Sequence, residues 1–244
     1  MANEFAPCTA EQKQAVLERL AVIRQNIAES CAEAGRQTDE VTLMAVTKTV
    51  SPELINLAVD QGVHVLGENR VQEFLSKRDD YRSSAEVQFI GHLQTNKVRQ
   101  IIDKVSLIQS VDSLHLAEAI SKAAEQNRIV MPVLLEVNIG GEESKSGVSA
   151  QELPKLLEQV QKLSGIRADG LMTIPPPCTD ESEQMRTFTA MQQLYRQMQQ
   201  LAPLKILSMG MSGDYAAAIR CGATLVRIGS ALFGARYYPP AAQQ

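Results

Sequence analysis

Short apolar segments alternate with amphipathic segments along most of the chain. The apolar segments are rich in Val, Ile and Leu and show little alternation of polar with apolar residues, which is typical of strands buried on both faces. They predict eight strands, at residues 41–49, 64–69, 87–93, 107–112, 131–138, 166–174, 206–211 and 225–230. A segment with helical spacing follows each strand, so the pattern predicts repeated βα units and a parallel sheet.

Eight βα units are the number found in a (β/α)8 barrel. We therefore predict a single α/β domain over residues 1–244, folded as a (β/α)8 TIM barrel. An open doubly wound sheet has the same alternation and is the alternative fold. No change in composition marks a second domain, and residues 237–244 are expected to form a short tail.

An amphipathic helix is predicted before the first strand. Its apolar residues recur at helical spacing at Val16, Leu17, Leu20, Ile23 and Ile27. Thr9 and Gln12 are spaced as in a capping box, and Gly35 suits the end of the helix. We expect residues 1–38 to form a helical extension that packs on the barrel.

Composition narrows the class of protein. The chain is 44% hydrophobic, enough for a large core, and carries a formal net charge of −4. Proteins that neutralise nucleic-acid phosphates are usually basic, so no nucleic-acid partner is expected. The sequence shows no signal peptide and no apolar segment long enough to span a bilayer. We expect a cytoplasmic protein with no membrane partner, and a monomer, because a lone barrel needs no partner to complete its core.

The four cysteines and three histidines are scattered along the chain. They form no CxxC pair, and no cysteine lies at metal-ligand spacing from a histidine. No metal site is therefore expected.

Functional residues of a (β/α)8 barrel gather at the C-terminal ends of its strands. The predicted strand ends of this chain carry a ring of mostly polar residues. In chain order they are Lys48, Glu68, Asn69, His92, Gln94, Asn96, Asp112, Asn138, Met172, Thr173, Ser208, Met211, Ser212, Arg227, Gly229 and Ser230. A ligand site is expected at this end of the barrel.

Two of the loops at this end have the character of phosphate-binding loops. "SMGMSGD" (208–214) follows the seventh strand, and "RIGS" (227–230) follows the eighth. Barrels often bind phosphate at these two loops through backbone N–H groups and a helix N-terminus. Small residues let the backbone approach an anion, and Ser212 and Ser230 supply hydroxyl groups. Tight βα turns without a ligand are the alternative interpretation.

Lys48 follows the first strand and supplies an amine. Burial lowers the pKa of a lysine, and a neutral amine attacks carbonyl groups to form Schiff bases. An ordinary lysine at a strand end, paired with Glu68 or Asp112, is the alternative. An amine that faces phosphate-binding loops suits a ligand with an aldehyde or ketone at one end and a phosphate at the other. Pyridoxal 5′-phosphate (PLP) and phosphorylated sugars both meet this description.

Seven segments of the chain resemble those of one known family. They are "AVTKT" with Lys48, "LGENRVQE" (66–73), "FIGHLQTNK" (89–97), "SKSGV" (144–148), "GLMTIP" (170–175), "SMGMSGD" (208–214) and "VRIGSALFGAR" (226–236). In this order they are similar to the segments of the pyridoxal phosphate homeostasis proteins (YggS/PROSC type). The resemblance implies a single barrel of PLP fold-type III, similar to the N-terminal domain of alanine racemase.

The resemblance also implies a role for each candidate residue. Lys48 would hold PLP as an internal aldimine, and Arg227 would lie near the pyridine nitrogen. Asn69 and Met172 would line the ring. The phosphate would be held by Ser212, Gly229 and Ser230, assisted by Ser208 and with Met211 in the same loop. Many relatives have threonine in place of Ser230, and serine retains the hydroxyl group.

A carrier of PLP is the function that the resemblance favours. Alanine racemase uses a tyrosine opposite the lysine, from a C-terminal domain of a partner subunit. This chain ends 14 residues after Ser230, and Tyr237 and Tyr238 are expected to be packing or exposed residues, so no second acid–base group is expected. We therefore predict a PLP homeostasis protein without strong turnover, for which PLP-dependent apoenzymes are candidate partners.

Three alternatives remain open. One is a PLP-dependent amino-acid racemase of low activity. Another is a Schiff-base aldolase that acts on a phosphorylated sugar through the same lysine and loops. The third is an interaction module that uses the N-terminal helix or the polar helix at 191–200.

Overall fold

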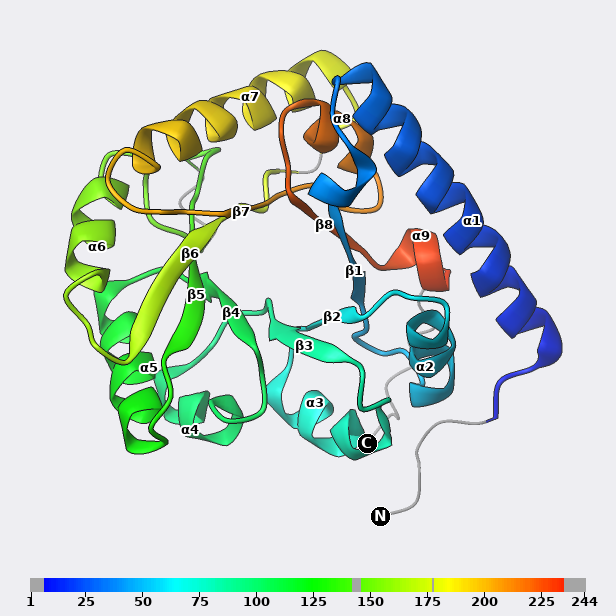
Figure 1. The fold of residues 1–244 in the computed structure, drawn as a ribbon, viewed down its shortest axis with the longest axis horizontal. Helices are drawn as coiled ribbons and strands as arrows, with labels where there is room; N and C mark the ends of the chain where they lie inside the picture. The colour runs from blue at the N-terminus through cyan, green and yellow to red at the C-terminus, as the bar shows by residue number, and fades with distance from the viewer. Residues whose placement is uncertain (1–6, 142–145, 177, 235–244) are drawn as a thin grey trace, which may run out of the picture.

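The computed structural model describes residues 7–141, 146–176 and 178–234 of the chain. Eight parallel strands close into a barrel in chain order, with β8 paired to β1 (Figure 1). The strands are β1 (Thr42–Val46), β2 (Val65–Glu68), β3 (Glu86–Phe89), β4 (Leu107–Val111), β5 (Met131–Glu136), β6 (Ile166–Met172), β7 (Ile206–Ser208) and β8 (Leu225–Ile228). The predicted (β/α)8 barrel is confirmed, and the open doubly wound sheet is wrong.

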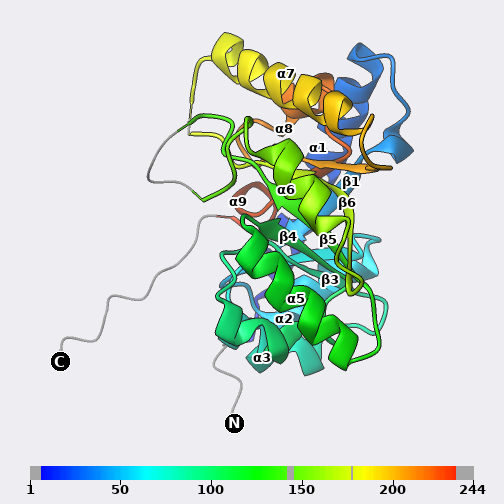
Figure 2. The ribbon, with the colours of Figure 1, turned by 90° about the vertical axis from the view of Figure 1, so that its left-hand side faces the viewer.

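Helices form a ring around the barrel (Figures 1 and 2). They are α1 (Ala10–Glu33), α2 (Pro52–Asp60), α3 (Val71–Lys77), α4 (Val98–Ile101), α5 (Leu114–Gln126), α6 (Leu153–Val160), α7 (Glu181–Met198), α8 (Tyr215–Arg220) and α9 (Ser230–Phe233). Short 3-10 turns occur at Thr38–Glu40, Arg78–Asp80 and Thr95–Lys97. In the part of the chain that the structure describes, each helix is too short or too polar to cross a membrane.

The helix α1 precedes the barrel and packs on its outside. Thr9 caps it, the Gln12 side chain completes the capping box, and Gly35 follows its end with φ of +67°. The helix contacts α2, α8 and α9, and it lies along them on the outside of the barrel in Figure 1. The predicted helix is thus confirmed within the described residues. Residues 1–6 of the expected extension and the expected tail at 237–244 lie outside them.

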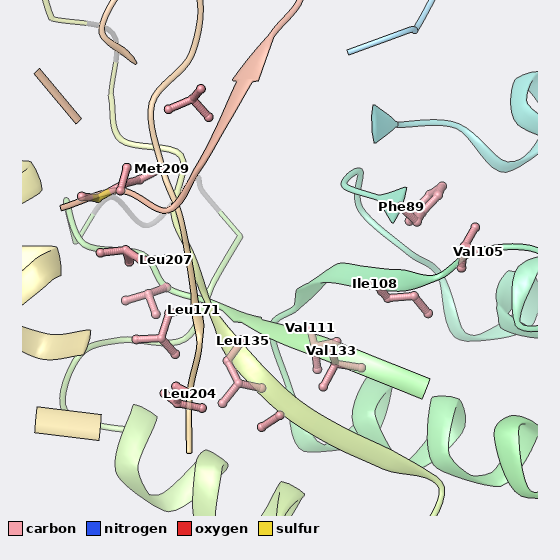
Figure 3. Packing of buried hydrophobic residues seen from close by; sticks show 14 of the residues in the cluster. Phe89, Val105, Ile108, Val111, Val133, Leu135, Leu171, Leu204, Leu207 and Met209 are labelled. Carbon is pink, nitrogen blue, oxygen red and sulfur yellow. The ribbon is translucent and has the colours of Figure 1, made fainter. Parts of the chain in front are cut away.

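Apolar side chains fill the space on both sides of the barrel wall. The larger layer lies between the strands and the helices, and Figure 3 shows part of it on β3 to β7. A smaller set fills the barrel interior, including Met44, Val46 and Ile90. Gly67 makes this interior packing possible, because a Cβ there would lie 2.6 Å from Sδ of Met44.

The predicted strands extend too far at their C-terminal ends. The third was predicted to reach residue 93 but ends at Phe89, and the seventh was predicted to reach residue 211 but ends at Ser208. The first ends at Val46, so Lys48 lies in a turn rather than in the strand. The apolar pattern continues past these points because the first loop residues are still buried at the mouth of the barrel, although they leave the strand ladder.

Candidate functional site

Lys48 lies at the C-terminal mouth of the barrel, two residues after β1. Met44 and Val46 of β1 point into the barrel interior, where they pack together. Thr47 points the other way, toward α3. Its hydroxyl group donates to the carboxyl of Glu68, which pairs with Lys77 of α3. Lys48 follows Thr47 in the turn at the barrel mouth and is half-buried there.

A chain of hydrogen bonds crosses the barrel interior below the mouth. Nε2 of Gln109 donates to Oε1 of Gln88 at 2.7 Å, and Oγ of Ser208 donates to Oε1 of Gln109 at 2.7 Å. Arg227 closes the chain, donating to Oγ of Ser208 at 2.6 Å and to the carbonyl of Thr173 at 2.8 Å. All five residues are buried, so the position of the Arg227 guanidinium is fixed by directional bonds.

Arg227 is the buried cation of the site. Burial lowers the pKa of its guanidinium to about 10, and the carboxyl groups of Asp214 and Glu136 oppose that shift. The side chain therefore remains charged at neutral pH. A fixed positive charge in the barrel interior disfavours a second positive charge beside it.

Glu136 is a buried carboxyl group at the end of β5 that the sequence analysis missed. The pKa of Glu136 is raised to about 7, mainly by burial. The nearby carboxyl of Asp112 raises this pKa further, and the charge of Arg227 opposes the rise. Glu136 lies two residues after Leu134 on β5, so its side chain points to the same face of the strand, into the barrel interior where Leu134 packs. The interior thus contains a carboxyl group that changes charge near neutral pH.

We expect Glu136→Gln to reduce the pH dependence of stability between about pH 5 and pH 8. A glutamate with an ordinary pKa of 4.5 loses its proton in the unfolded chain, whereas in the folded protein it keeps the proton up to about pH 7. The folded state therefore holds one more proton in this window, and wild-type stability falls as the pH rises. The neutral variant lacks that fall, so its stability relative to wild type should increase by about 3 kcal/mol from pH 5 to pH 8.

Urea unfolding of both proteins at several pH values measures this difference. A difference in the free energy of unfolding that stays constant from pH 5 to pH 8 would contradict the raised pKa of Glu136.

The loops after β7 and β8 meet at the mouth, as the sequence predicts. Oγ of Ser212 accepts the backbone N–H groups of Gly229 and Ala231, each at 3.2 Å. Gly210 has φ of +91°, and a Cβ there would lie 2.6 Å from Cβ of Ala218, so glycine allows the loop to pass close to α8. The N–H groups of Gly229 and Ala231, at the start of α9, thus both point at Oγ of Ser212, and the exposed Ser230 lies between these two residues in the chain.

Asn69 and Met172 occupy different depths. Asn69 follows β2, and its Oδ1 is a buried oxygen with no hydrogen-bond partner among the described residues. Met172 ends β6 and is fully buried in the interior with Leu107 and Leu134. Met211 lies in the Ser212 loop, where its backbone N–H donates to Oδ1 of Asp214 at 2.6 Å.

The structure brings the predicted residues together at one end of the barrel. Lys48 follows β1, Arg227 lies on β8 and Ser208 on β7, and these three strands are neighbours. His92 lies at the same end but is mostly exposed, with Nδ1 3.9 Å from Oδ2 of Asp112. Tyr237 and Tyr238 lie outside the described residues. Within residues 7–141, 146–176 and 178–234, His, Cys, Asp and Glu side chains form no group of three that could hold a metal ion.

Sequence reasoning missed three interior residues, Gln88, Gln109 and Glu136. Gln88 and Gln109 lie inside the short strands β3 and β4, and Glu136 ends β5, where apolar residues precede it. A polar residue within a strand buried on both faces must find a partner or a ligand, and that rule could have identified all three.

The donor set fits a ligand with an aldehyde, an aromatic ring nitrogen and a phosphate. Converging N–H groups and serine hydroxyls suit a phosphate. The buried Oδ1 of Asn69 has no hydrogen-bond partner in the described part of the chain and can accept a bond from a ligand. The buried guanidinium of Arg227 can donate to an unprotonated ring nitrogen. Lys48 supplies an amine at the same mouth.

The chain is similar to a known family of barrel domains over most of its length. The family of the alanine racemase N-terminal domain matches residues 19–237. An alanine racemase of Clostridium difficile has the same fold, with a TM-score of 0.75 and 16% identity over 95% of this chain and 61% of its own. The barrel is therefore of the alanine racemase N-terminal type.

Two nearer relatives define the family. A pyridoxal phosphate homeostasis protein of Aquifex aeolicus is 44% identical over 91% of this chain and 98% of its own length. The structure of PipY from Synechococcus elongatus with PLP bound matches with a TM-score of 0.78 and 31% identity, over 90% of this chain and all of its own. This chain belongs to the pyridoxal phosphate homeostasis protein family, as the sequence motifs predict.

Proposed function

We propose that this chain binds PLP in the mouth of its barrel and acts in PLP homeostasis. The proposal is supported by the position of three groups on or directly after the neighbouring strands β1, β8 and β7: the Lys48 turn, the buried Arg227 and the loop of Ser212. An amine, a cation and a cluster of N–H donors match the aldehyde, the ring nitrogen and the phosphate of one cofactor. The PLP named in the PipY structure supports the same choice.

The proposed roles follow from position. The Lys48 amine would form a C=N bond with the aldehyde carbon, and the aldehyde oxygen would leave as water. Arg227 would face the pyridine nitrogen. Asn69 and Met172 would lie beside and beneath the ring. The phosphate would be held by backbone and hydroxyl groups of Ser208, Met211, Ser212, Gly229 and Ser230.

Arg227 is also the reason to propose a carrier rather than an efficient enzyme. PLP supplies catalysis by acting as an electron sink, which is strongest when its ring nitrogen is protonated. A fixed guanidinium opposes protonation of that nitrogen. The family name of the relatives agrees with this role. A racemase of low activity is the second candidate, favoured by the shared alanine racemase fold.

Domain organisation, oligomeric state, location and protein partners are part of the same proposal. We propose one domain over residues 1–244, a monomer located in the cytoplasm, that exchanges PLP with PLP-dependent apoenzymes. A closed barrel with its own core supports the monomer, and four cysteines without a disulfide bond support a reducing compartment.

Titration of the purified chain with PLP tests the proposed function. We expect the yellow absorbance of a Schiff base at one equivalent of PLP, together with α-proton exchange of amino acids at rates far below those of an enzyme. Nuclear magnetic resonance in deuterated water measures the exchange. Enzymatic exchange rates would favour the racemase, and a chain that acquires no yellow colour would favour the aldolase and contradict PLP binding.

A further inference from the structure

A buried cluster of charged side chains from β2 and α3 lies beside the turn that carries Lys48. The Glu68 side chain is fully buried, Lys77 is 2% exposed and Glu73 is 18% exposed. Nζ of Lys77 lies 2.8 Å from Oε1 of Glu73 and 3.3 Å from Oε1 of Glu68. Burial of such charges is unfavourable unless further hydrogen bonds satisfy them. Several of these further bonds go to the two residues that flank Lys48.

The residue before Lys48 is held by its carbonyl and its hydroxyl group. Nζ of Lys77 donates to the carbonyl of Thr47 at 2.9 Å. Oγ1 of Thr47 donates to Oε1 of Glu68 at 2.7 Å, and the hydroxyl of Tyr81 donates to the same oxygen at 2.5 Å. Burial, together with the Glu68 carboxylate, raises the pKa of Tyr81, so its hydroxyl stays a donor. Thr47 is therefore fixed on two sides.

The residue after Lys48 is held by its N–H group. Oε1 of Glu73 accepts the backbone N–H of Thr49 at 2.5 Å. Thr49 has φ of +61°, in the left-handed region that a β-branched residue rarely adopts. Val50 donates its N–H to the carbonyl of Thr47 at 3.1 Å, which closes a turn with Lys48 and Thr49 at its centre. An unfavourable conformation persists only where its surroundings enforce it, and Glu73 provides that bond.

We propose that Glu73 and Lys77 are positioning residues for Lys48. One turn apart on α3, they hold the backbone on either side of Lys48 and so set the point from which its side chain enters the barrel mouth. They act through Thr47 and Thr49 and lie on the outer side of the barrel wall. This inference rests on the proposed role of Lys48 as the amine that binds PLP.

Glu73→Ala is the variant that tests the proposal, because Glu73 is partly exposed and its loss leaves Lys77 paired with Glu68. We expect the apparent affinity for PLP to fall about tenfold, since a hydrogen bond to a charged acceptor is lost at a strained turn. Glu73→Gln keeps an acceptor for the Thr49 N–H and should recover most of the affinity. Glu158→Ala is the matched control, because it removes the exposed ion pair that Glu158 of α6 makes with Lys162.

Pyridoxamine 5′-phosphate separates positioning of Lys48 from damage to the site, because it carries an amine in place of the aldehyde. We expect Glu73→Ala to bind it as wild type does. An equal loss for both ligands, or unchanged affinity for PLP, would overturn the proposal. A wild-type chain that binds neither ligand would instead refute the proposed function.

A measurement on the wild type avoids dependence on the folding of the variant. Amide hydrogen exchange of the full chain should show the Thr49 N–H protected, although it lies in a turn. Fast exchange at Thr49, comparable to that of the exposed Gly213, would also overturn the proposal.

Discussion

Replacement of Lys48 by alanine is expected to abolish the yellow absorbance that PLP acquires on binding. The lysine amine is the group proposed to form the C=N bond, and alanine cannot replace it. Apparent affinity for PLP should fall at least about tenfold, which corresponds to about 1.4 kcal/mol. Absorbance titration and equilibrium dialysis measure the two effects.

Residual binding through the phosphate should survive in this variant. The N–H groups of Gly229 and Ala231 donate to Oγ of Ser212, so the two loops proposed to hold the phosphate are joined without any contribution from Lys48. Lys122→Ala is a suitable control, because Lys122 is exposed on α5. If Lys48→Ala kept the yellow absorbance, Lys48 would lose its proposed role. If Lys122→Ala lost it as well, the loss of colour in Lys48→Ala would not be specific to Lys48.

Replacement of Arg227 by methionine is expected to have the largest effect on stability. Two hydrogen bonds from a buried guanidinium are lost, and the Thr173 carbonyl and the Glu136 carboxyl lose their cationic neighbour. We expect a loss of about 3 kcal/mol in the free energy of unfolding, measured by urea denaturation at pH 7. Binding of PLP should weaken in the same variant, because its ring nitrogen would lose the proposed donor.

Arg167→Met provides the matched control for this prediction. Arg167 also lies on a barrel strand, but it is exposed and pairs with Asp169 at 2.5 Å near the start of β6. An exposed ion pair of this kind contributes less than about 1 kcal/mol. Equal losses of stability in the two variants would show that the interior network does not depend on Arg227.

The fold was predictable because its main signal is local. Eight short apolar strands, each followed by a helix, leave few arrangements that bury both faces of the strands. The ends of the strands were less predictable, since burial continues beyond the last residue of the ladder. The residues before Lys48 illustrate this difference, because Thr47 is fully buried although β1 ends at Val46.

The sequence indicated site residues at or just after the ends of strands, including Ser208 and Met172, the last residues of β7 and β6, and Arg227 on β8. Lys48, Ser212 and Gly229 lie in the loops where a barrel places its ligands. Gln109 lies on β4 and Glu136 ends β5. Their position relative to Arg227 depends on how opposite sides of the barrel face each other, and Gln109 is linked to Arg227 through Ser208.

Two residues of the cluster beneath Lys48, Glu73 and Lys77, are spaced four residues apart on a helix. That spacing usually indicates an exposed pair on the surface of a helix. Only the structure shows that α3 packs against the Lys48 turn, so that the pair holds the backbone there.

Chemical trapping identifies the amine that holds PLP, which we propose to be Lys48. Borohydride reduces a Schiff base to a stable secondary amine, so the wild-type chain loaded with one equivalent of PLP can be reduced, digested and mapped by mass spectrometry. We predict a single modified peptide with the PLP-derived mass on Lys48. Modification of another lysine, or a yellow complex that yields no modified peptide after reduction, would contradict the account.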